Sequence, residues 1–264
     1  GGYTTWPART AALEPNAEPK IVEALLALLE RVSHRRRRPV ADEHGAYAQA
    51  VLAAKPLAYW RGNELQGPQA RDTTRRNNHG AYEDGIAFYL EGPASPAFSG
   101  IQVNRAPHYA GGRLRAVVSG LRDRYSLEMW FYNGLPANAR PLTGYLFCRS
   151  TDRLGIGGAQ RATGKLFFQA GNTVLEGKTP VGLKTWNHLV LTRQGEEVSV
   201  YLNGEETPEI TGRAQAAAPS SGVLIGGCQD NSANFEGRID EVSMFSRRLT
   251  AGEAVRHFAA GGVR

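Results

Sequence analysis

Cysteine, methionine and long apolar runs are scarce in this sequence. Its 264 residues include two cysteines and two methionines. Zinc sites need about four nitrogen or sulfur ligands at close spacing, and two isolated cysteines do not supply them. No stretch of about 18 apolar residues occurs, so the sequence predicts no membrane-spanning helix. The chain opens on glycine without an initiator methionine, and we expect it to be a processed or excised product.

Sequence motifs that carry catalysis are absent as well. The six histidines include no His-Glu-x-x-His pair, and there is no Gly-x-Ser-x-Gly turn or glycine-rich phosphate loop. His188 lies inside an apolar strand-like run, where a histidine is more often structural than a catalytic base. We therefore expect that the protein is not an enzyme.

The charge balance is basic, with a formal net charge of +6. A basic protein favours acidic partners such as nucleic acid, anionic lipid or acidic polysaccharide. Four of the positive charges form one run, Arg35 to Arg38, which we interpret as a solvated basic linker. No aromatic-rich nucleic-acid motif accompanies this run, so we expect no nucleic-acid partner.

Two helices are predicted near the start of the chain. In residues 19–33, apolar side chains recur with helical spacing, and the arginine run and Pro39 end that helix. A second helix is predicted at 42–54, with Asp42 as its N-cap. Two short helices cannot bury a core alone. We expect them to dock on the domain that follows or on a neighbouring chain.

From residue 57 onward, the apolar period changes to two, which is typical of strands. Short strands with turn signals between them and no crossover helices predict an antiparallel sandwich rather than a parallel sheet. In one run, Leu127, Met129 and Phe131 alternate with polar and aromatic neighbours. The strand-like runs are 86–90, 125–132, 143–149, 165–170, 186–193, 196–203, 222–227 and 238–245.

Two local signals place a turn and a helix near the end of the chain. Asn203-Gly204 follows a strand-like run and predicts a type I′ hairpin turn, because both residues accept positive φ. Thr250 and Glu253 have the spacing of a capping box, which predicts a helix at 250–258.

Five segments, in order, resemble the laminin G-like (LamG-like jelly-roll) modules of large bacterial surface and secreted proteins. They are AVLAAKPLAYWRGNE at 50–64, ARDTTRRNNHGAYEDG at 70–85, YSLEMWFYNG at 125–134, TWNHLVLTRQGEEVSVYLNGE at 185–205 and FEGRIDEVSMFSRRLTAGEAVRHF at 235–258. The resemblance implies an all-β, concanavalin A-like antiparallel β-sandwich (jelly roll). The domain would span residues 46–264 behind a helical arm at 1–45, in an extracellular or cell-surface protein.

The resemblance also implies a structural calcium ion. Related modules often hold Ca²⁺ where the early loop meets the last strand, and the matching residues are Asp72 and Asp240, with Glu64 as a third ligand. Calcium prefers six to eight oxygen ligands. Arg75-Arg76 departs from the family pattern and weakens this assignment. The alternative is that Asp72 caps a turn and that Asp240 pairs with an arginine.

A carbohydrate platform is a second expectation, because sugars stack on exposed aromatic rings. Glu128, Trp130 and Tyr132 share one face of their strand, and the polar loop with Asp230 and Asn231 offers hydrogen bonds. The alternative is that Trp130 belongs to the core and that the loop is a solvated connection. Glycosidases of the laminarinase type share this sandwich, but their Glu-x-Asp-x-Glu spacing is absent here.

The roles of the two cysteines and of the arm stay open at this stage. Cys148 and Cys228 form a disulfide if their strands meet, and otherwise remain packed thiols. We expect a non-catalytic, lectin-like module that binds a polysaccharide, an acidic one given the net charge. The alternative is a structural or adhesive module that self-associates through residues 1–45.

Overall fold

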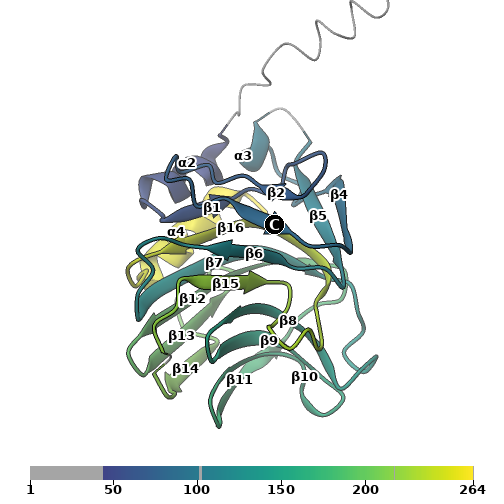
Figure 1. The fold of residues 1–264 in the computed structure, drawn as a ribbon, viewed down its shortest axis with the longest axis vertical. Coiled ribbons are helices and arrows are strands. Elements are labelled where there is room, and N and C mark those ends of the chain that lie inside the picture. The colour runs from purple at the N-terminus through teal and green to yellow at the C-terminus, as the bar shows by residue number, and fades with distance from the viewer. Residues whose placement is uncertain (1–43, 101–102, 217, 264) are drawn as a thin grey trace, which may run out of the picture. The chain divides into compact units, whose positions relative to one another are not determined.

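The computed structural model describes residues 44–100, 103–216 and 218–263. They form a sandwich of two eight-stranded sheets, and all strand pairs among the described residues are antiparallel (Figure 1). The expected all-β class is therefore confirmed, and helices account for only 11% of the structure. The predicted helix at 19–33 and nearly all of the arm at 1–45 lie outside the described residues.

The first sheet has the strand order β14-β13-β12-β7-β16-β5-β4, with β1 also paired to β16. Its central strand β7 contains the run that sequence analysis placed at 125–132. The strands are β1 (Ala58–Trp60), β4 (Ile86–Glu91), β5 (Arg105–Ala110), β7 (Arg124–Asn133), β12 (Trp186–Gln194), β13 (Glu197–Leu202), β14 (Ile210–Arg213) and β16 (Glu236–Phe245).

The second sheet has the strand order β11-β10-β9-β8-β15-β6-β3-β2. Chain segments that connect the two sheets therefore cross the ends of the sandwich. The strands are β2 (Gln69–Ala70), β3 (Gly80–Tyr82), β6 (Leu114–Val117), β8 (Leu142–Arg149), β9 (Asp152–Gly158), β10 (Arg161–Ala170), β11 (Thr173–Pro180) and β15 (Gly222–Ile225).

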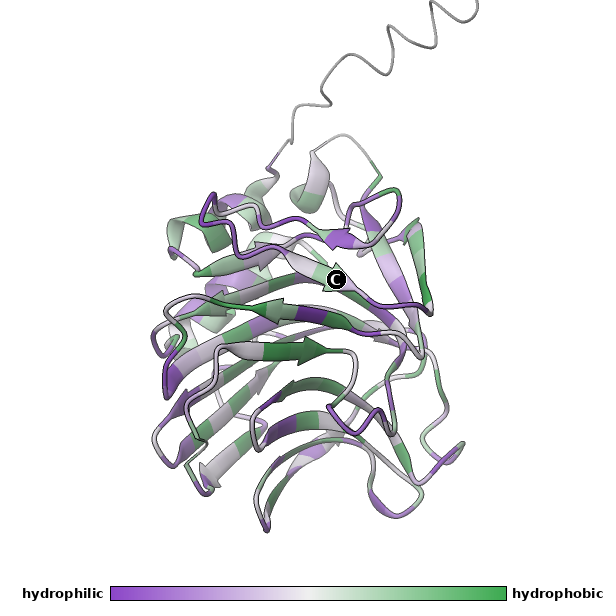
Figure 2. Cartoon of the chain, viewed as in Figure 1, coloured by the Kyte–Doolittle hydropathy of each residue, from purple (hydrophilic) through white to green (hydrophobic). Residues whose placement is uncertain are grey.

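The main core lies between the inner faces of the two sheets. Leu127, Met129 and Phe131 of β7 are fully buried in it, together with Leu146 and Phe168 from the second sheet. Because alternate side chains of a strand point to opposite faces, the intervening residues of β7 point to the outer face of the first sheet. In Figure 2, hydrophobic residues mark the strands of both sheets.

Three helices cover part of that outer face. They are α2 (Ala46–Ala53), α3 (Pro96–Ser99) and α4 (Ala251–Gly261), and Figure 1 shows α2 and α4 beside β1 and β16. A second hydrophobic cluster joins the helices to the sheet. Gly261 permits the close approach of α4, since a Cβ there would lie 2.7 Å from the Trp130 ring.

The local signals near the chain end are confirmed, whereas the start of the second helix is not. Thr250 and Glu253 form a capping box at α4. Asn203 and Gly204 both have positive φ in a turn closed by a bond from the Glu205 N–H to Leu202 O. Helix α2, however, begins after Gly45, which provides no side-chain cap, and the predicted N-cap Asp42 lies outside the described residues.

Nothing among the described helices has the length and apolar character needed to cross a membrane.

Candidate functional site

A network of buried polar side chains centres on Glu128 of β7. Its Oε1 accepts hydrogen bonds from the Tyr47 hydroxyl of α2 at 2.8 Å and from His188 Nε2 of β12 at 2.9 Å. Its Oε2 accepts a bond from His257 Nδ1 of α4 at 2.8 Å. All four side chains are buried. The Glu128 carboxylate thus links α2 and α4 to the outer face of the first sheet through hydrogen bonds.

Trp130 packs in the same layer. Its ring lies 5.3 Å from that of Phe98, 5.7 Å from that of Phe258 and 5.9 Å from that of Tyr47, so all three helices contact it. Trp130 and Glu128 are both fully buried. Their expected roles in a sugar platform are therefore wrong, because helices exclude solvent and ligand from them. The alternative, a core tryptophan, is confirmed.

The histidines set the ionisation of Glu128. Burial alone would raise its pKa, but the hydrogen bonds and positive charge of His188 and His257 outweigh burial and lower the pKa to about 2. Burial would likewise lower the pKa of His257, and its bond to Glu128 raises it instead. The structural role expected for His188 is confirmed. Tyr47 and His257 have the same role, because they also form hydrogen bonds with the buried Glu128 carboxylate.

These pKa shifts predict how stability depends on pH. Glu128 has a folded pKa below its ordinary 4.5, so its contribution is complete above pH 4.5 and is lost as pH falls toward about 2. His257 has a raised pKa, so its contribution is complete below 6.5 and is lost as pH rises through the folded value. We expect the difference in unfolding free energy between wild type and Glu128→Gln to be largest between pH 4.5 and 6.5.

Urea titrations at pH 3, 5.5 and 8 measure this difference. Glu197→Gln is the control, since Glu197 is exposed on β13. A difference that stays constant across the three pH values would contradict the assignment.

Beyond the helices, four partly exposed side chains form a line across the outer face of the first sheet. We call Trp186, Tyr132, Arg238 and His108 the outer row. Trp186 pairs with Tyr132, Tyr132 with Arg238, and Arg238 with His108 in the strand register. Directly paired residues project to the same face, and neighbouring strands are about 4.8 Å apart. The row therefore spans roughly 14 Å of surface.

The side chains of the outer row contact one another. The rings of Tyr132 and Trp186 are 5.5 Å apart at an angle of 52°. The guanidinium of Arg238 lies over the Tyr132 ring, 5.0 Å from its centre. Trp186 also packs against the helix-covered cluster, which steadies its ring. Of the residues predicted for a sugar platform, only Tyr132 belongs to this row.

The three carboxylates predicted to bind calcium are not brought together. Among the described residues, no group of three or more His, Cys, Asp or Glu side chains is placed to hold a metal ion. Asp72 caps its own loop, where its oxygens accept bonds from the backbone N–H groups of Thr74 and Asn78. Glu64 accepts a bond from the Arg71 N–H. These bonds give Asp72 and Glu64 a role in stabilising their own loops.

Asp240 differs from the other two carboxylates. Its Oδ2 accepts a bond from Asn104 Nδ2 at 2.9 Å, rather than from an arginine, and its buried Oδ1 has no partner. Burial and the nearby Glu241 carboxylate raise the pKa of Asp240. Calcium binding stays a prediction.

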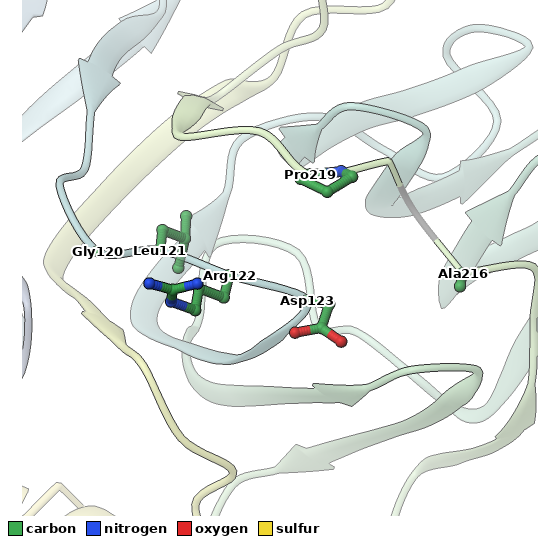
Figure 3. A pocket seen from close by; sticks show the side chains of 6 residues that line it. All are labelled: Gly120, Leu121, Arg122, Asp123, Ala216 and Pro219. Carbon is green, nitrogen blue, oxygen red and sulfur yellow. The ribbon is translucent and has the colours of Figure 1, made fainter.

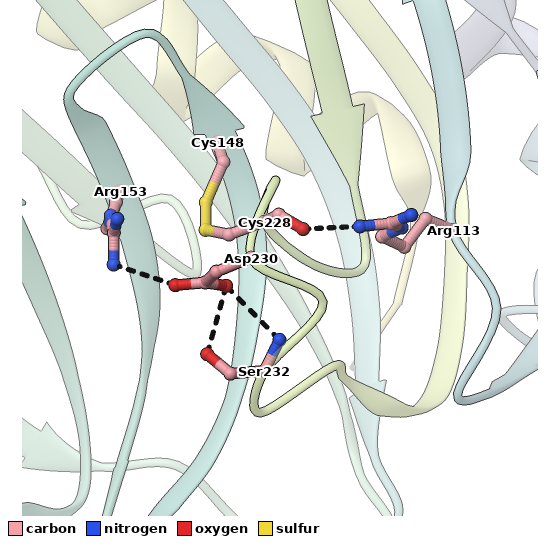
Figure 4. Close-up of a disulfide and its surroundings, with 6 residues drawn as sticks. All are labelled: Arg113, Cys148, Arg153, Cys228, Asp230 and Ser232. Carbon is pink, nitrogen blue, oxygen red and sulfur yellow. Dashed lines mark hydrogen bonds and ion pairs between the residues drawn. A yellow bond between two sulfur atoms is a disulfide. The ribbon is translucent and has the colours of Figure 1, made fainter.

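Asp230 and Asn231 lie in the loop between β15 and β16, and Asp230 contacts the second sheet at Arg153 of β9, whereas Tyr132 is on the first sheet. The Asp230 carboxylate accepts bonds from the N–H and hydroxyl of Ser232 and lies 3.4 Å from Arg153 Nη1 (Figure 4). Asn231 Oδ1 accepts a bond from Asn234. Their polar groups thus stabilise the loop between β15 and β16, in agreement with the alternative of a solvated connection.

A disulfide attaches this loop to the second sheet. Cys148 of β8 is bonded to Cys228, and their Cα atoms are 5.3 Å apart (Figure 4). Arg113 donates a hydrogen bond to the carbonyl of Cys228. Of the two alternatives for the cysteines, the structure contains the disulfide.

A cavity lies at one end of the sandwich, between the β6–β7 and β14–β15 connections. It has a volume of about 560 Å³ (Figure 3). No aromatic side chain is among the described residues that line it, so it offers a sugar no ring for stacking. These lining residues are Gly120, Leu121, Arg122, Asp123, Ala216 and Pro219.

Sequence reasoning missed Trp186 and Arg238 as members of a surface site. Trp186 begins the predicted run 186–193 and strand β12, and Arg238 begins the predicted run 238–245 and lies third in strand β16. Their placement beside Tyr132 depends on which strands pair and in which register, which the periodicity of a single strand does not contain. The available signal was the aromatic residue at the start of the 186–193 run.

The fold is a jelly-roll β-sandwich with helices on one outer face. Residues 109–254, more than half of the chain, match the family Laminin_G_3, described as the concanavalin A-like lectin/glucanases superfamily. The chain belongs to this superfamily, which confirms the resemblance. No curated protein sequence shows significant similarity to the chain.

Several solved structures share the fold. Domain 4 of AbnA, an extracellular arabinanase from Geobacillus stearothermophilus, in complex with arabinotriose, is 17% identical with a TM-score of 0.56, covering 77% of this chain and 98% of that chain. Trypanosoma rangeli sialidase is 18% identical with a TM-score of 0.54, covering 78% of this chain and 32% of that chain. A structure of botulinum neurotoxin type C, whose cell entry depends on two ganglioside molecules, is 16% identical with a TM-score of 0.54, covering 80% and 52%.

Proposed function

We propose that the chain is a non-catalytic carbohydrate-binding module of an extracellular or cell-surface protein, and that the outer row is its binding surface. The observation that carries this proposal is the contact between the two partly exposed rings of Tyr132 and Trp186 on a rigid sheet. The apolar face of a sugar buries well on such rings, and neighbouring polar groups bind its hydroxyls.

The surroundings of the row support this surface. Arg238 and His108 continue the line beyond the rings and provide hydrogen-bonding groups. The row lies on strands rather than loops, so its side chains keep their spacing before a ligand arrives. Among proteins of this fold, the arabinanase domain binds arabinotriose, which is consistent with sugar binding by a jelly-roll module.

The burial of Glu128 and Glu241 supports a non-catalytic role. Retaining glycosidases need two carboxyl groups about 5 Å apart that face the substrate. Glu128 and Glu241 are fully buried, and Glu128 is bonded to three side chains that hold the helices in place. A sugar on the outer row has no access to either carboxyl group without loss of the helical cover.

Variants of the outer row test the proposal. Trp186→Ala and Tyr132→Ala remove the two rings, and each is expected to weaken glycan binding by at least about tenfold, as removal of a central aromatic contact typically does. Affinity electrophoresis in gels that contain arabinan, xylan or polygalacturonate measures the loss. Wild type is expected to be retarded by at least one of these polymers.

Tyr89→Ala is the matched control. Tyr89 is 46% exposed and carries an arginine stack like that on Tyr132, with Arg105 4.6 Å from its ring. Arg105 and His108 are three positions apart on β5, so Arg105 points to the opposite face from the outer row. Equal losses in Tyr89→Ala and Trp186→Ala, or no retardation of wild type by any polymer, would contradict the proposed surface.

A further inference from the structure

The guanidinium of Arg238 is held in a fixed position on the outer row. Its Cζ lies over the Tyr132 ring, 5.0 Å from the ring centre, and its Nη1 donates a hydrogen bond of 2.6 Å to the backbone carbonyl of Glu91 on β4. An arginine fixed in this way loses little entropy when it binds an anion, because its planar donors are already oriented.

Arg238 has no carboxylate partner among the described residues. Arg238 shares this with Arg105, whereas two other partly exposed arginines have a carboxylate partner: Arg153 pairs with Asp230, and Arg248 pairs with Glu197. The Nε of Arg238 is buried and out of reach of a ligand, whereas Nη2 donates no hydrogen bond to a described residue. One guanidinium on the outer row therefore keeps both its charge and part of its donor capacity free of internal partners.

The neighbouring charged groups leave Arg238 as the cation of the row. Burial and the positive charge of Arg238 lower the pKa of His108, while Glu236 raises it more weakly. His108 is therefore neutral near pH 7 and offers hydrogen bonds without charge. Glu236, exposed two residues before Arg238, is the carboxylate that opposes anion binding here.

We propose that the outer row selects acidic sugar chains, and that Arg238 contacts the carboxylate of a sugar stacked on Tyr132 and Trp186. This inference rests on the proposed carbohydrate-binding function and names its ligand class. The Arg238 guanidinium lies 5.0 Å from the centre of the Tyr132 ring, so a single sugar packed against this ring reaches the cation as well. Hydrogen bonds between guanidinium and carboxylate are charge-assisted and stronger than bonds to neutral hydroxyls.

Matched polymers with and without charge test this selectivity. Affinities are compared for polygalacturonate and its methyl ester, and for hyaluronan and alginate with their carboxyl-reduced forms, all at about 150 mM salt, where charges beyond about 8 Å are screened. In wild type, the acidic member of at least one pair is expected to bind about tenfold more tightly than its neutral counterpart.

The decisive quantity is this acid-to-neutral affinity ratio in three variants. Arg238→Gln is expected to remove the preference, and Arg238→Lys, which keeps the charge without the planar fork, is expected to retain part of it. Arg105→Gln is the matched control: Arg105 also stacks on a tyrosine and has a buried Nε without a partner, but it points to the other face. Its ratio is expected to remain at the wild-type value.

The outcomes separate this inference from the function on which it rests. An unchanged ratio in Arg238→Gln, or an equal fall in Arg105→Gln, overturns the role of Arg238. Equal binding of both members of every pair, with binding lost in Trp186→Ala, overturns acid selectivity and leaves the platform intact. No binding to any polymer overturns the proposed function itself. Circular dichroism and melting curves confirm that each variant is folded.

Discussion

Replacing Glu128 by alanine is expected to lower the free energy of unfolding by about 3–5 kcal/mol. The carboxylate is fully buried and accepts hydrogen bonds from Tyr47, His188 and His257. Its removal leaves these three donors buried without an acceptor, and each unsatisfied donor costs about 1–3 kcal/mol. Because two of the donors lie on α2 and α4, the helices lose their polar attachment to the sheet.

Urea denaturation followed by tryptophan fluorescence and far-UV circular dichroism measures this loss. Glu197→Ala is the control, because Glu197 is exposed and its pair with Arg248 lies at the surface. Such pairs contribute about 0–1 kcal/mol. If Glu128→Ala lost no more stability than Glu197→Ala, the network would not be what holds the helical cover.

Loss of the disulfide is expected to have a comparable effect. Cys148 and Cys228 are 80 residues apart, and cross-linking a loop of that length stabilises the fold by about 4 kcal/mol in the chain-entropy treatment. We expect dithiothreitol to lower the urea midpoint of wild type and to leave that of the Cys148→Ser/Cys228→Ser double variant unchanged. A reductant effect of equal size in both proteins would contradict the assignment.

Loss of the disulfide should spare the proposed ligand site. The bond attaches a loop to the second sheet, whereas the outer row lies on the first. Under conditions in which the double variant stays folded, we expect its glycan affinity to equal that of wild type. A selective loss of binding would instead favour the loop that carries Asp230 and Asn231.

The periodicity of apolar residues predicts many strands of the sandwich. The strands that it does not predict have features that explain why. The long strands β7, β12 and β16 alternate clearly because one face of each lies in the core. Strand β9 was missed because its DRLGIGG sequence contains three glycines, which are typical of turns. Strand β5 contains Pro107, which argues against a strand, and β2 has only two residues.

The candidate site was less predictable because it depends on what covers each face. Alternation correctly placed Glu128, Trp130 and Tyr132 on one face of β7, opposite the core residues. Alternation does not show that helices cover Glu128 and Trp130 and leave Tyr132 partly exposed. That distinction arises from tertiary packing, and so does the pairing that brings Trp186 and Arg238 beside Tyr132.

Tryptophan resonances give the most direct test of the outer row as the ligand site. The chain has four tryptophans, and of the three that the structure describes, Trp60 and Trp130 are buried whereas Trp186 is partly exposed. In protein labelled with 5-fluorotryptophan, each resonance is assigned by a Trp→Phe variant and followed by ¹⁹F NMR during titration with a polymer that binds. We predict that the Trp186 resonance shifts saturably and that those of Trp60 and Trp130 stay in place. Saturable binding without a shift of Trp186 would contradict the account.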